Sequence, residues 1–162
     1  MPVYIALGSN LGDSMVNIKR AFAKLQELSD ITIQKSSFWR STPVDCPAGS
    51  PEFINAAVII EPLPEETPES LLVKLQDLED QFGRQTKVTV NEPRPLDLDI
   101  IAYEEKTRKT PQLTLPHPRW HQRRFVLEPL NEIAPDAILP GQTQTVFQLL
   151  LELNTTEVLI RL

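Results

Sequence analysis

The spacing of hydrophobic and polar positions predicts where strands and helices lie in the first half of the chain. An apolar run at residues 3–7 predicts a strand, and residues 8–13 predict a tight turn that opens a helix. The apolar positions of that helix recur every three or four residues, at Met15, Ile18, Phe22, Leu25 and Leu28. Alternation at residues 31–39 predicts a half-buried strand, and the apolar run at 53–60 predicts a central strand.

The second half of the chain begins with a helix signal and ends with weaker patterns. Thr67, Pro68 and Glu69 combine a capping hydroxyl, a proline and an acid, which is typical of a helix start. The apolar stripe of this helix consists of Leu71, Leu75, Leu78 and Phe82, and Gly83 suits its end. A polar loop at 84–95 and a strand at 96–103 follow. Later elements are expected after Pro118 to about residue 127, near 146–153 and near 158–162.

The order of these elements predicts the fold class. Strand, helix, strand, strand, helix and strand succeed one another between residues 3 and 103, which is the βαββαβ order of ferredoxin-like folds. We therefore expect an α+β protein whose antiparallel sheet carries helices packed on one face, with a C-terminal extension. The proline-rich stretch at 42–52 is expected to be a loop. A length of 162 residues predicts one domain, residues 1–162.

Composition narrows the classes of function. Hydrophobic residues make up 41% of the chain, which is enough for a packed core. The net charge of −6 argues against a nucleic-acid partner. The chain has no apolar run of about 18 residues and no visible signal peptide, so we expect no membrane partner. The single cysteine, Cys46, forms no internal disulfide, which favours the cytoplasm, and we expect a monomer.

The most informative pattern is a pair of aspartates in the strand at 96–103. Side chains two apart share one face of a strand, so Asp97 and Asp99 should point together while Leu98 and Ile100 point into the core. Two carboxylates at this spacing repel each other unless a cation lies between them, and oxygen ligands favour Mg²⁺. The alternative is a solvated strand face, or carboxylates paired with Arg94.

A second candidate segment holds two histidines and several arginines. His117 and His121 are four residues apart, which on a helix would permit zinc binding. However, Pro118 is expected to place His117 before the first helical turn, and no glutamate follows it directly. Arg123 suits phosphate binding through its fixed fork of donors, although a surface charge is the ordinary role of an arginine. The chain has no standard phosphate-binding loop.

Together these segments resemble the family of 6-hydroxymethyl-7,8-dihydropterin pyrophosphokinases of folate biosynthesis. The resemblance covers nearly the whole chain, in the family's order. The segments that carry it are residues 4–12, 53–58, 78–84, 94–100 and 115–127. The family implies transfer of the β,γ-diphosphate of ATP to the hydroxymethyl group of the pterin, leaving AMP, with two Mg²⁺ ions and ATP as co-substrate.

The resemblance also assigns roles to individual residues. It implies that Asp97 and Asp99 bind the metal ions and that Arg84 and Arg94 close over the triphosphate, all four in catalytic roles. The further positions that match ATP contacts of the family are Gln76, Glu79, Ile100, Thr114, His117 and Arg123. A helix position such as Gln76 or Glu79 is equally consistent with a solvated face, and Ile100 with the core.

For the pterin, the family uses an aromatic sandwich to which Phe53 and Phe125 correspond. Asn55 shares a strand face with Phe53, and its amide both donates and accepts hydrogen bonds. The backbone groups that match the pterin-reading loop belong to Thr42, Pro43 and Asp45.

Three positions depart from the family pattern. Asn91 stands where many relatives have the tryptophan of Trp-Gly-Pro, Thr86 stands where some have an arginine, and Phe53 replaces a frequent tyrosine. Lys87 is a candidate for the missing charge. Two other functions stay open, namely a pterin- or nucleotide-binding module of the same fold without turnover, and a metal-dependent phosphohydrolase.

Overall fold

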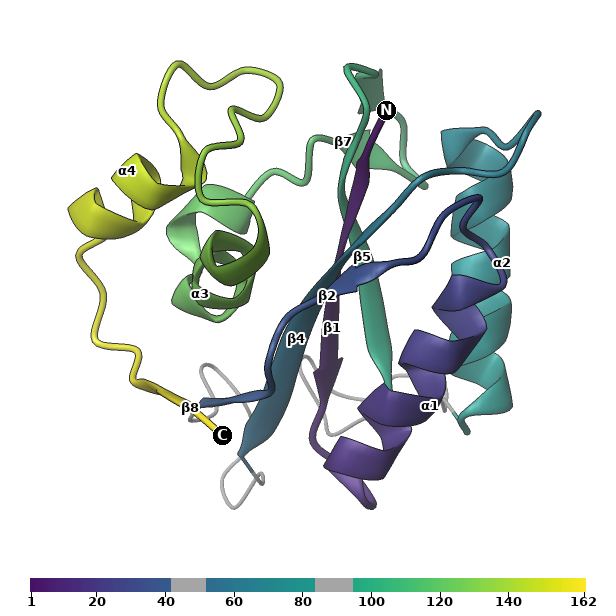
Figure 1. Ribbon diagram of the computed structural model, residues 1–162, viewed down its shortest axis with the longest axis horizontal. Coiled ribbons are helices and arrows are strands. Elements are labelled where there is room, and N and C mark those ends of the chain that lie inside the picture. Colours follow the sequence, from purple (N-terminus) through teal and green to yellow (C-terminus); the bar gives the residue numbers. More distant parts are fainter. Residues whose placement is uncertain (42–51, 84–94) are drawn as a thin grey trace.

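The computed structural model describes residues 1–41, 52–83 and 95–162, and it confirms an α+β fold (Figure 1). The strands of the main sheet are β1 (Val3–Ser9), β2 (Gln34–Lys35), β3 (Trp39–Ser41), β4 (Phe53–Ile60), β5 (Asp97–Tyr103) and β8 (Leu159–Arg161). The helices are α1 (Ser14–Gln26), α2 (Pro68–Gln81), α3 (Arg124–Ile133) and α4 (Val146–Glu152). A short 3-10 helix, η1 (Trp120–Gln122), precedes α3, and a small separate ladder joins β6 (Arg108–Lys109) to β7 (Thr114–Leu115).

The main sheet has the strand order β5-β1-β4-β3-β8, with β2 also paired to β4. All of these pairings are antiparallel. The βαββαβ core therefore has the predicted architecture, in which β1 lies at the centre between β4 and β5. The C-terminal extension adds β8 to the sheet beside β3.

Both long helices begin where the sequence predicts, because side-chain caps satisfy their first amides. The Asp13 carboxylate accepts a hydrogen bond from the backbone N–H of Val16, at 3.2 Å. Thr67 and Ser70 form a reciprocal capping box at the start of α2, with Pro68 at its first position. These caps fix where each helix enters the sheet layer, and hence which face it buries.

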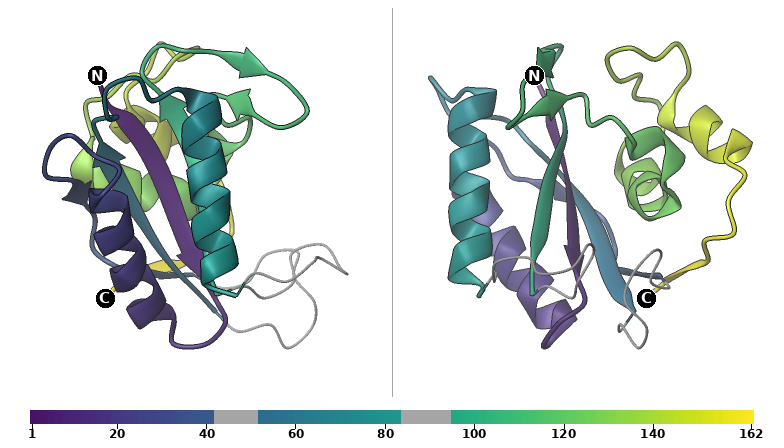
Figure 2. Two further views of the ribbon diagram at one scale, coloured as in Figure 1. Left: turned by 90° about the vertical axis from the view of Figure 1, so that its right-hand side faces the viewer. Right: turned by 180° about the vertical axis from the view of Figure 1, so that it is seen from behind.

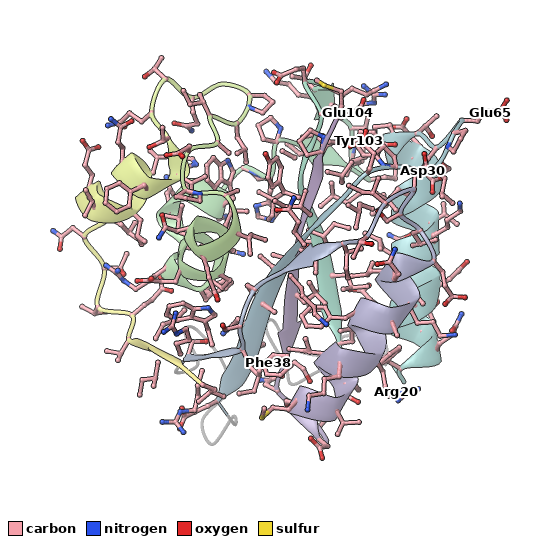
Figure 3. The ribbon with its side chains drawn as sticks, viewed as in Figure 1. Arg20, Asp30, Phe38, Glu65, Tyr103 and Glu104 are labelled. Atoms are coloured by element: carbon pink, nitrogen blue, oxygen red, sulfur yellow. The ribbon has the colours of Figure 1, made fainter. Side chains whose placement is uncertain are left out.

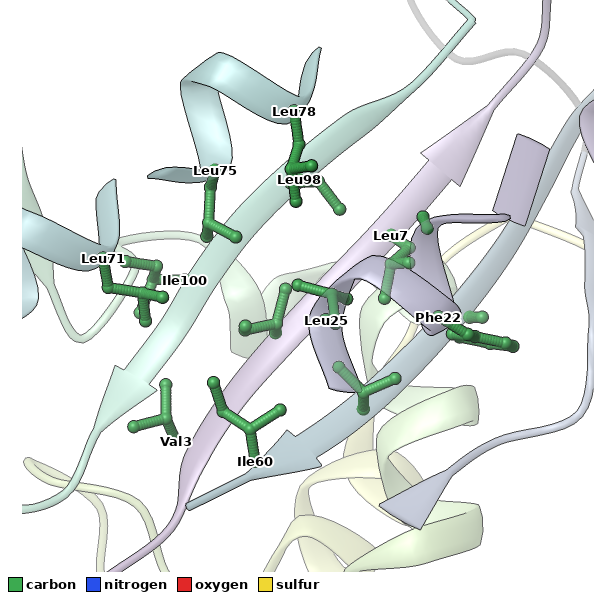
Figure 4. Close-up of a cluster of buried hydrophobic side chains, with 14 of the residues drawn as sticks. Val3, Leu7, Phe22, Leu25, Ile60, Leu71, Leu75, Leu78, Leu98 and Ile100 are labelled. Atoms are coloured by element: carbon green, nitrogen blue, oxygen red, sulfur yellow. The ribbon is translucent and has the colours of Figure 1, made fainter. Parts of the chain in front are cut away.

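One face of the sheet packs against α1 and α2. Leu71, Leu75 and Leu78 of α2 lie over Leu98 and Ile100 of β5, as Figure 4 shows. The buried side chains of β1 in this first core are Val3, Ile5 and Leu7, and those of α1 are Ile18, Ala21, Phe22 and Leu25. The prediction of helices on one face holds for this half of the protein.

The opposite face is covered by the C-terminal third of the chain, which the sequence did not predict. There α3 and α4 form a second core with Ile101, Ala102 and Leu139, and Figure 2 shows the two helical layers on either side of the sheet. The β1–β5 register shifts between Tyr4 and Ile5, which brings both Ile101 and Ala102 into this second core. Helices therefore cover both faces.

The predicted strand at 31–39 is wrong as a single element, because the structure has two short strands there. Ser36 remains bonded to β4, where its backbone N–H donates to Ala57 O at 2.9 Å. Phe38, labelled in Figure 3, then turns toward α1. Its ring stacks on that of Phe22, with the ring centroids 6.0 Å apart. This packing interrupts the alternation between β2 and β3.

The segment after Pro118 also differs from the prediction. A 3-10 turn comes first, and α3 then continues to Ile133, well beyond residue 127. The hydrophobic pattern of α3 is interrupted by Pro129, but that residue is buried within the helix. Among the described residues, no helix combines the length and the apolar character needed to cross a membrane.

Candidate active site

A single row of the sheet brings the predicted metal and pterin residues together. Gly8 at the end of β1 pairs with Asn55 of β4 on one side and with Asp97 of β5 on the other. Residues paired directly across strands share one face, so Asn55 and Asp97 lie on the same side of the sheet. That side is the α3 face, because the alternate residues Leu7, Ala56 and Leu98 belong to the first core.

The two aspartates have the predicted orientation. Asp97 and Asp99 are half-buried on the α3 face, whereas Leu98 and Ile100 are buried in the first core. Within the part of the chain that the structure describes, no group of three or more His, Cys, Asp or Glu side chains forms a metal site. A pair of carboxylates still fits Mg²⁺, which usually takes one or two carboxylates and completes its shell with water and phosphate oxygens.

Both helices of the first core hold the start of β5 in place. Glu79 of α2 is 3% exposed, and its carboxylate accepts a hydrogen bond from the backbone N–H of Leu98 at 2.8 Å. Asn17 of α1 donates to the carbonyl of Pro95 at 3.2 Å. Because β5 is an edge strand, its outward N–H needs such a partner. The alternative interpretation, in which these helix positions only face solvent, therefore fits the exposed Gln76 but is wrong for the buried Glu79.

His117 lies beside β5 as a neutral imidazole. Its backbone N–H donates to Ile101 O at 2.8 Å, and its Nδ1 accepts from the N–H of Arg119 at 3.2 Å. Burial, and to a lesser extent the charges of Arg123 and Arg119, together lower the pKa of His117 to about 4 against the opposing effect of Asp97. With Nδ1 accepting, the proton of the neutral ring resides on Nε2, which is then a hydrogen-bond donor.

As predicted, His117 precedes the helical turn, since η1 begins only at Trp120. His121 lies inside η1, where its ring meets Trp120 edge to face at 5.8 Å. The described residues therefore give no support to zinc binding by the two histidines.

Arg123 and Phe125 lie at the start of α3. Arg123 is the N-cap residue, makes no capping hydrogen bond with its side chain, and holds its guanidinium carbon 5.5 Å from the centre of the Phe125 ring. Both side chains are half-buried. Thr114 is exposed in β7, and Ile100 is 4% exposed within the first core, which favours the core interpretation of that residue.

Asn55 is buried, and its amide is fixed by β3. Its Nδ2 donates to the carbonyl of Trp39 at 3.2 Å and to Ser41 Oγ at 2.7 Å. These two bonds use both N–H groups, so Oδ1 is the atom that a ligand would contact as an acceptor. The sequence predicted that this amide both donates and accepts hydrogen bonds to a ligand. In the structure only its acceptor oxygen is left for a ligand.

Several predicted site residues lie outside the described residues. They are Thr42, Pro43 and Asp45 of the pterin set and Arg84 and Arg94 of the phosphate set, together with Lys87 and Asn91. Their roles stay predictions from the resemblance.

Sequence reasoning missed two residues that shape the site. Gly8 leaves the middle of the row without a side chain, and a Cβ there would lie 3.7 Å from both Asn55 Oδ1 and Phe53 Cδ1. Glu132 of α3 accepts hydrogen bonds from Ser37 and from Trp39 Nε1, which join α3 to the strand that fixes Asn55. The glycine was visible in the Gly-Ser-Asn turn, whereas no sequence signal linked residues 37 and 132.

A carboxylate pair, a neutral histidine donor and an arginine on one side of an α+β sheet are suited to holding a metal-bound polyphosphate. This combination is what a phosphate-transferring enzyme requires. Residues 4–135 match the 7,8-dihydro-6-hydroxymethylpterin-pyrophosphokinase (HPPK) family. The chain therefore belongs to that family, whose members are pyrophosphokinases of folate biosynthesis that use ATP as co-substrate.

Curated relatives support this membership along most of the chain. The 2-amino-4-hydroxy-6-hydroxymethyldihydropteridine pyrophosphokinase of Synechocystis is 35% identical over 154 residues, which are 95% of this chain and 77% of that protein. The protein of the same name from Haemophilus influenzae is 40% identical over 139 residues, covering 85% of this chain and 84% of the relative. That of Bacillus subtilis is 40% identical over 131 residues, covering 80% and 76%.

A solved structure supports the fold. Wild-type HPPK-DHPS from Plasmodium falciparum, crystallised with pteroate, superposes with a TM-score of 0.70 at 15% identity. The match covers 93% of this chain and 42% of that longer one. At this identity the likeness is one of fold alone.

Proposed function

We propose that this chain transfers the β,γ-diphosphate of ATP to the hydroxymethyl group of 6-hydroxymethyl-7,8-dihydropterin, with Mg²⁺ held by Asp97 and Asp99. AMP and the pterin diphosphate are the products. The observation that carries this proposal is the row in which Asn55 and Asp97 flank Gly8 on one face of the sheet. It supports a site in which a flat heterocycle and a metal-bound phosphate chain would lie next to each other.

The residues at the metal position fit Mg²⁺ by their chemistry. Asp97 and Asp99 offer carboxylate oxygens from one face of β5. The backbone of this strand is held by Glu79, which accepts a hydrogen bond from the N–H of Leu98. Bound Mg²⁺ would neutralise phosphate charge and hold the two reactants in line. We propose two ions, as in the family, with the phosphates and water supplying the ligands that the protein does not.

The remaining groups of the chain bind and orient the nucleotide. His117 presents Nε2–H at neutral pH, so it donates to an acceptor on ATP without adding a charge. Arg123 offers a fork of donors to phosphate oxygens. We propose that Gln76, Glu79 and Thr114 contribute to the nucleotide side, while Ile100 stays part of the first core, and that Arg84 and Arg94 neutralise the triphosphate.

The pterin occupies the part of the face that includes Asn55. In this proposal its ring stacks between Phe53 and Phe125, and Asn55 Oδ1 accepts a hydrogen bond from one of its N–H groups. Gly8 supplies a floor without a side chain, so that the ring reaches the backbone. Backbone groups of Thr42, Pro43 and Asp45 complete the recognition of the same edge.

The proposed site uses residues of one chain only. We therefore expect a monomer to be active, and we place it in the cytoplasm, where ATP is supplied. The proposed chemistry does not depend on either expectation. It depends on the row of Asn55, Gly8 and Asp97, which lies within one sheet.

A product assay tests the proposal. The protein is incubated with ATP and Mg²⁺, with and without the pterin alcohol, and AMP, ADP and phosphate are quantified. We expect AMP to appear only when the pterin is present. Phosphate release without the pterin would indicate a phosphohydrolase, and binding of both ligands without AMP would indicate a binding module; either result would overturn the proposal.

A further inference from the structure

The first turn of α3 lacks a cap of its own. The N-cap residue, Arg123, forms no capping hydrogen bond, and an arginine side chain has no acceptor with which to form one. The first amides of a helix need partners from elsewhere. In α3 the N–H groups of Val126 and Leu127 both reach the carbonyl of Arg123, at 3.1 and 3.0 Å. The amide of Phe125 precedes them and gains nothing from that carbonyl.

A carboxylate from the C-terminal extension supplies this partner. The backbone N–H of Phe125 donates to Glu157 Oε2 at 3.3 Å, across 32 positions of sequence. A negative charge at this end of a helix also interacts favourably with the helix dipole. Glu157 thus takes the place that a serine, threonine or aspartate would normally occupy at the N-cap.

The segment that carries Glu157 is held at both of its ends. Near its beginning, the carbonyl of Leu153 accepts a hydrogen bond from Arg124 Nη2 at 3.3 Å. At its end, β8 pairs with β3, where Arg161 lies opposite Trp39. Figure 1 shows this segment running from α4 past α3 to the sheet. The same segment therefore contacts the start of α3 and the strand whose Trp39 and Ser41 fix Asn55.

We infer that Glu157 is a positioning residue for the pterin, which acts by fixing the backbone of Phe125 relative to β3. This rests on the proposed stacking of the pterin against Phe125. The family match ends at residue 135, so Glu157 belongs to the part of the chain beyond it. Arg123 cannot cap the helix itself, because its side chain has no acceptor, and Glu157 supplies the cap in its place.

The test compares Glu157→Ala and Glu157→Gln with the wild-type protein. Glu152→Ala is a matched control, since this exposed glutamate of the same extension bonds only to Gln144 among the contacts seen. We expect Glu157→Ala to speed hydrogen exchange at the Phe125 amide and to raise the KM for the pterin, each by roughly fivefold. The KM for ATP should stay within about twofold. Glu157→Gln, which keeps an acceptor oxygen, should recover part of both effects.

Each other outcome overturns the inference in a distinct way. Unchanged exchange at Phe125 would show that the contact does not protect this amide. Faster exchange with an unchanged pterin KM would show a cap without a role in binding. Phe125→Ala separates this from the proposed function: if it too leaves the pterin KM unchanged, the stacking proposal itself fails. If Phe125→Ala raises the KM for the pterin and Glu157→Ala does not, the inference about Glu157 fails but the stacking proposal stands. Circular dichroism at the assay temperature confirms that each variant is folded.

Discussion

Asn55 and Asp97 lie on the two strands that flank β1, and both pair with Gly8. Two strand spacings separate their Cα atoms, which is about 10 Å. Between them the sheet has no side chain. The buried amide of Asn55 and the half-buried carboxylate of Asp97 therefore lie on either side of the same stretch of bare backbone. The proposed chemistry depends on this arrangement.

The bare stretch predicts the effect of Gly8→Ala. The added Cβ would lie 3.7 Å from Asn55 Oδ1 and from Phe53 Cδ1, which is ordinary contact, so the fold should tolerate it. A methyl group there would nevertheless occupy the floor on which the pterin rests. We expect the melting temperature to change by only about 2 °C while pterin affinity falls at least about tenfold, as measured by calorimetry. Equal pterin affinity in the variant would show that the ring lies elsewhere.

Asp97→Asn tests the carboxylate pair. The amide keeps the size of the side chain but removes the charge that binds Mg²⁺, so AMP formation should fall by at least about a hundredfold. Asp77→Asn on the exposed surface of α2 is the control and should keep wild-type activity. A native circular dichroism spectrum with undiminished turnover in Asp97→Asn would refute the metal assignment.

Asn55→Ala should affect both stability and pterin binding. The substitution leaves the Trp39 carbonyl and Ser41 Oγ without the amide that now bonds to them, at a cost of about 1–3 kcal/mol in the free energy of unfolding. It also removes the acceptor proposed for the pterin. Denaturant unfolding and ligand titration measure the two effects, and we expect the affinity for an ATP analogue to remain within about twofold. An equal loss of affinity for the ATP analogue would contradict the proposal that Asn55 contacts the pterin and not the nucleotide.

The pH dependence of stability should carry a contribution from His117. Its pKa in the folded protein is about 4, below the ordinary value of 6.5, so the unfolded chain binds the proton first as pH falls. This contribution is complete above pH 6.5 and is lost as the pH falls toward 4. Because the imidazole is only partly buried, its size is on the order of 1 kcal/mol.

His117→Gln provides the comparison. The difference in unfolding free energy between the variant and the wild-type protein should shift in favour of the variant between pH 7.5 and pH 4.5. Chemical denaturation at both pH values measures it. A difference that does not vary with pH would mean that His117 titrates in the folded protein as it does in the unfolded chain.

The sequence predicted the elements whose signals are local. The turn at residues 8–13, the cap at Thr67 and the apolar stripes of α1 and α2 marked the first core, and the alternation around Leu98 gave the orientation of the two aspartates. These features depend on residues within one or two turns of each other, so they are visible without knowledge of the tertiary structure.

The features that it did not predict depend on contacts between distant segments. Phe38 breaks a strand because it stacks on Phe22, and α3 continues past residue 127 because the second core buries its apolar stripe. The Asn55 amide is restricted to acceptance by the strand beside it. Glu157 caps α3 from 32 residues beyond Phe125, and no local sequence pattern predicts that contact.

The most direct test of the central claim is a crystal structure with Mg²⁺, a non-hydrolysable ATP analogue and the pterin alcohol. We expect Mg²⁺ at about 2.0–2.1 Å from carboxylate oxygens of Asp97 and Asp99 and bonded to phosphate oxygens of the nucleotide. We also expect the pterin ring above Gly8, with its edge on Asn55 Oδ1. Phosphates bound on another face, with both aspartates instead bridged to basic side chains, would contradict it.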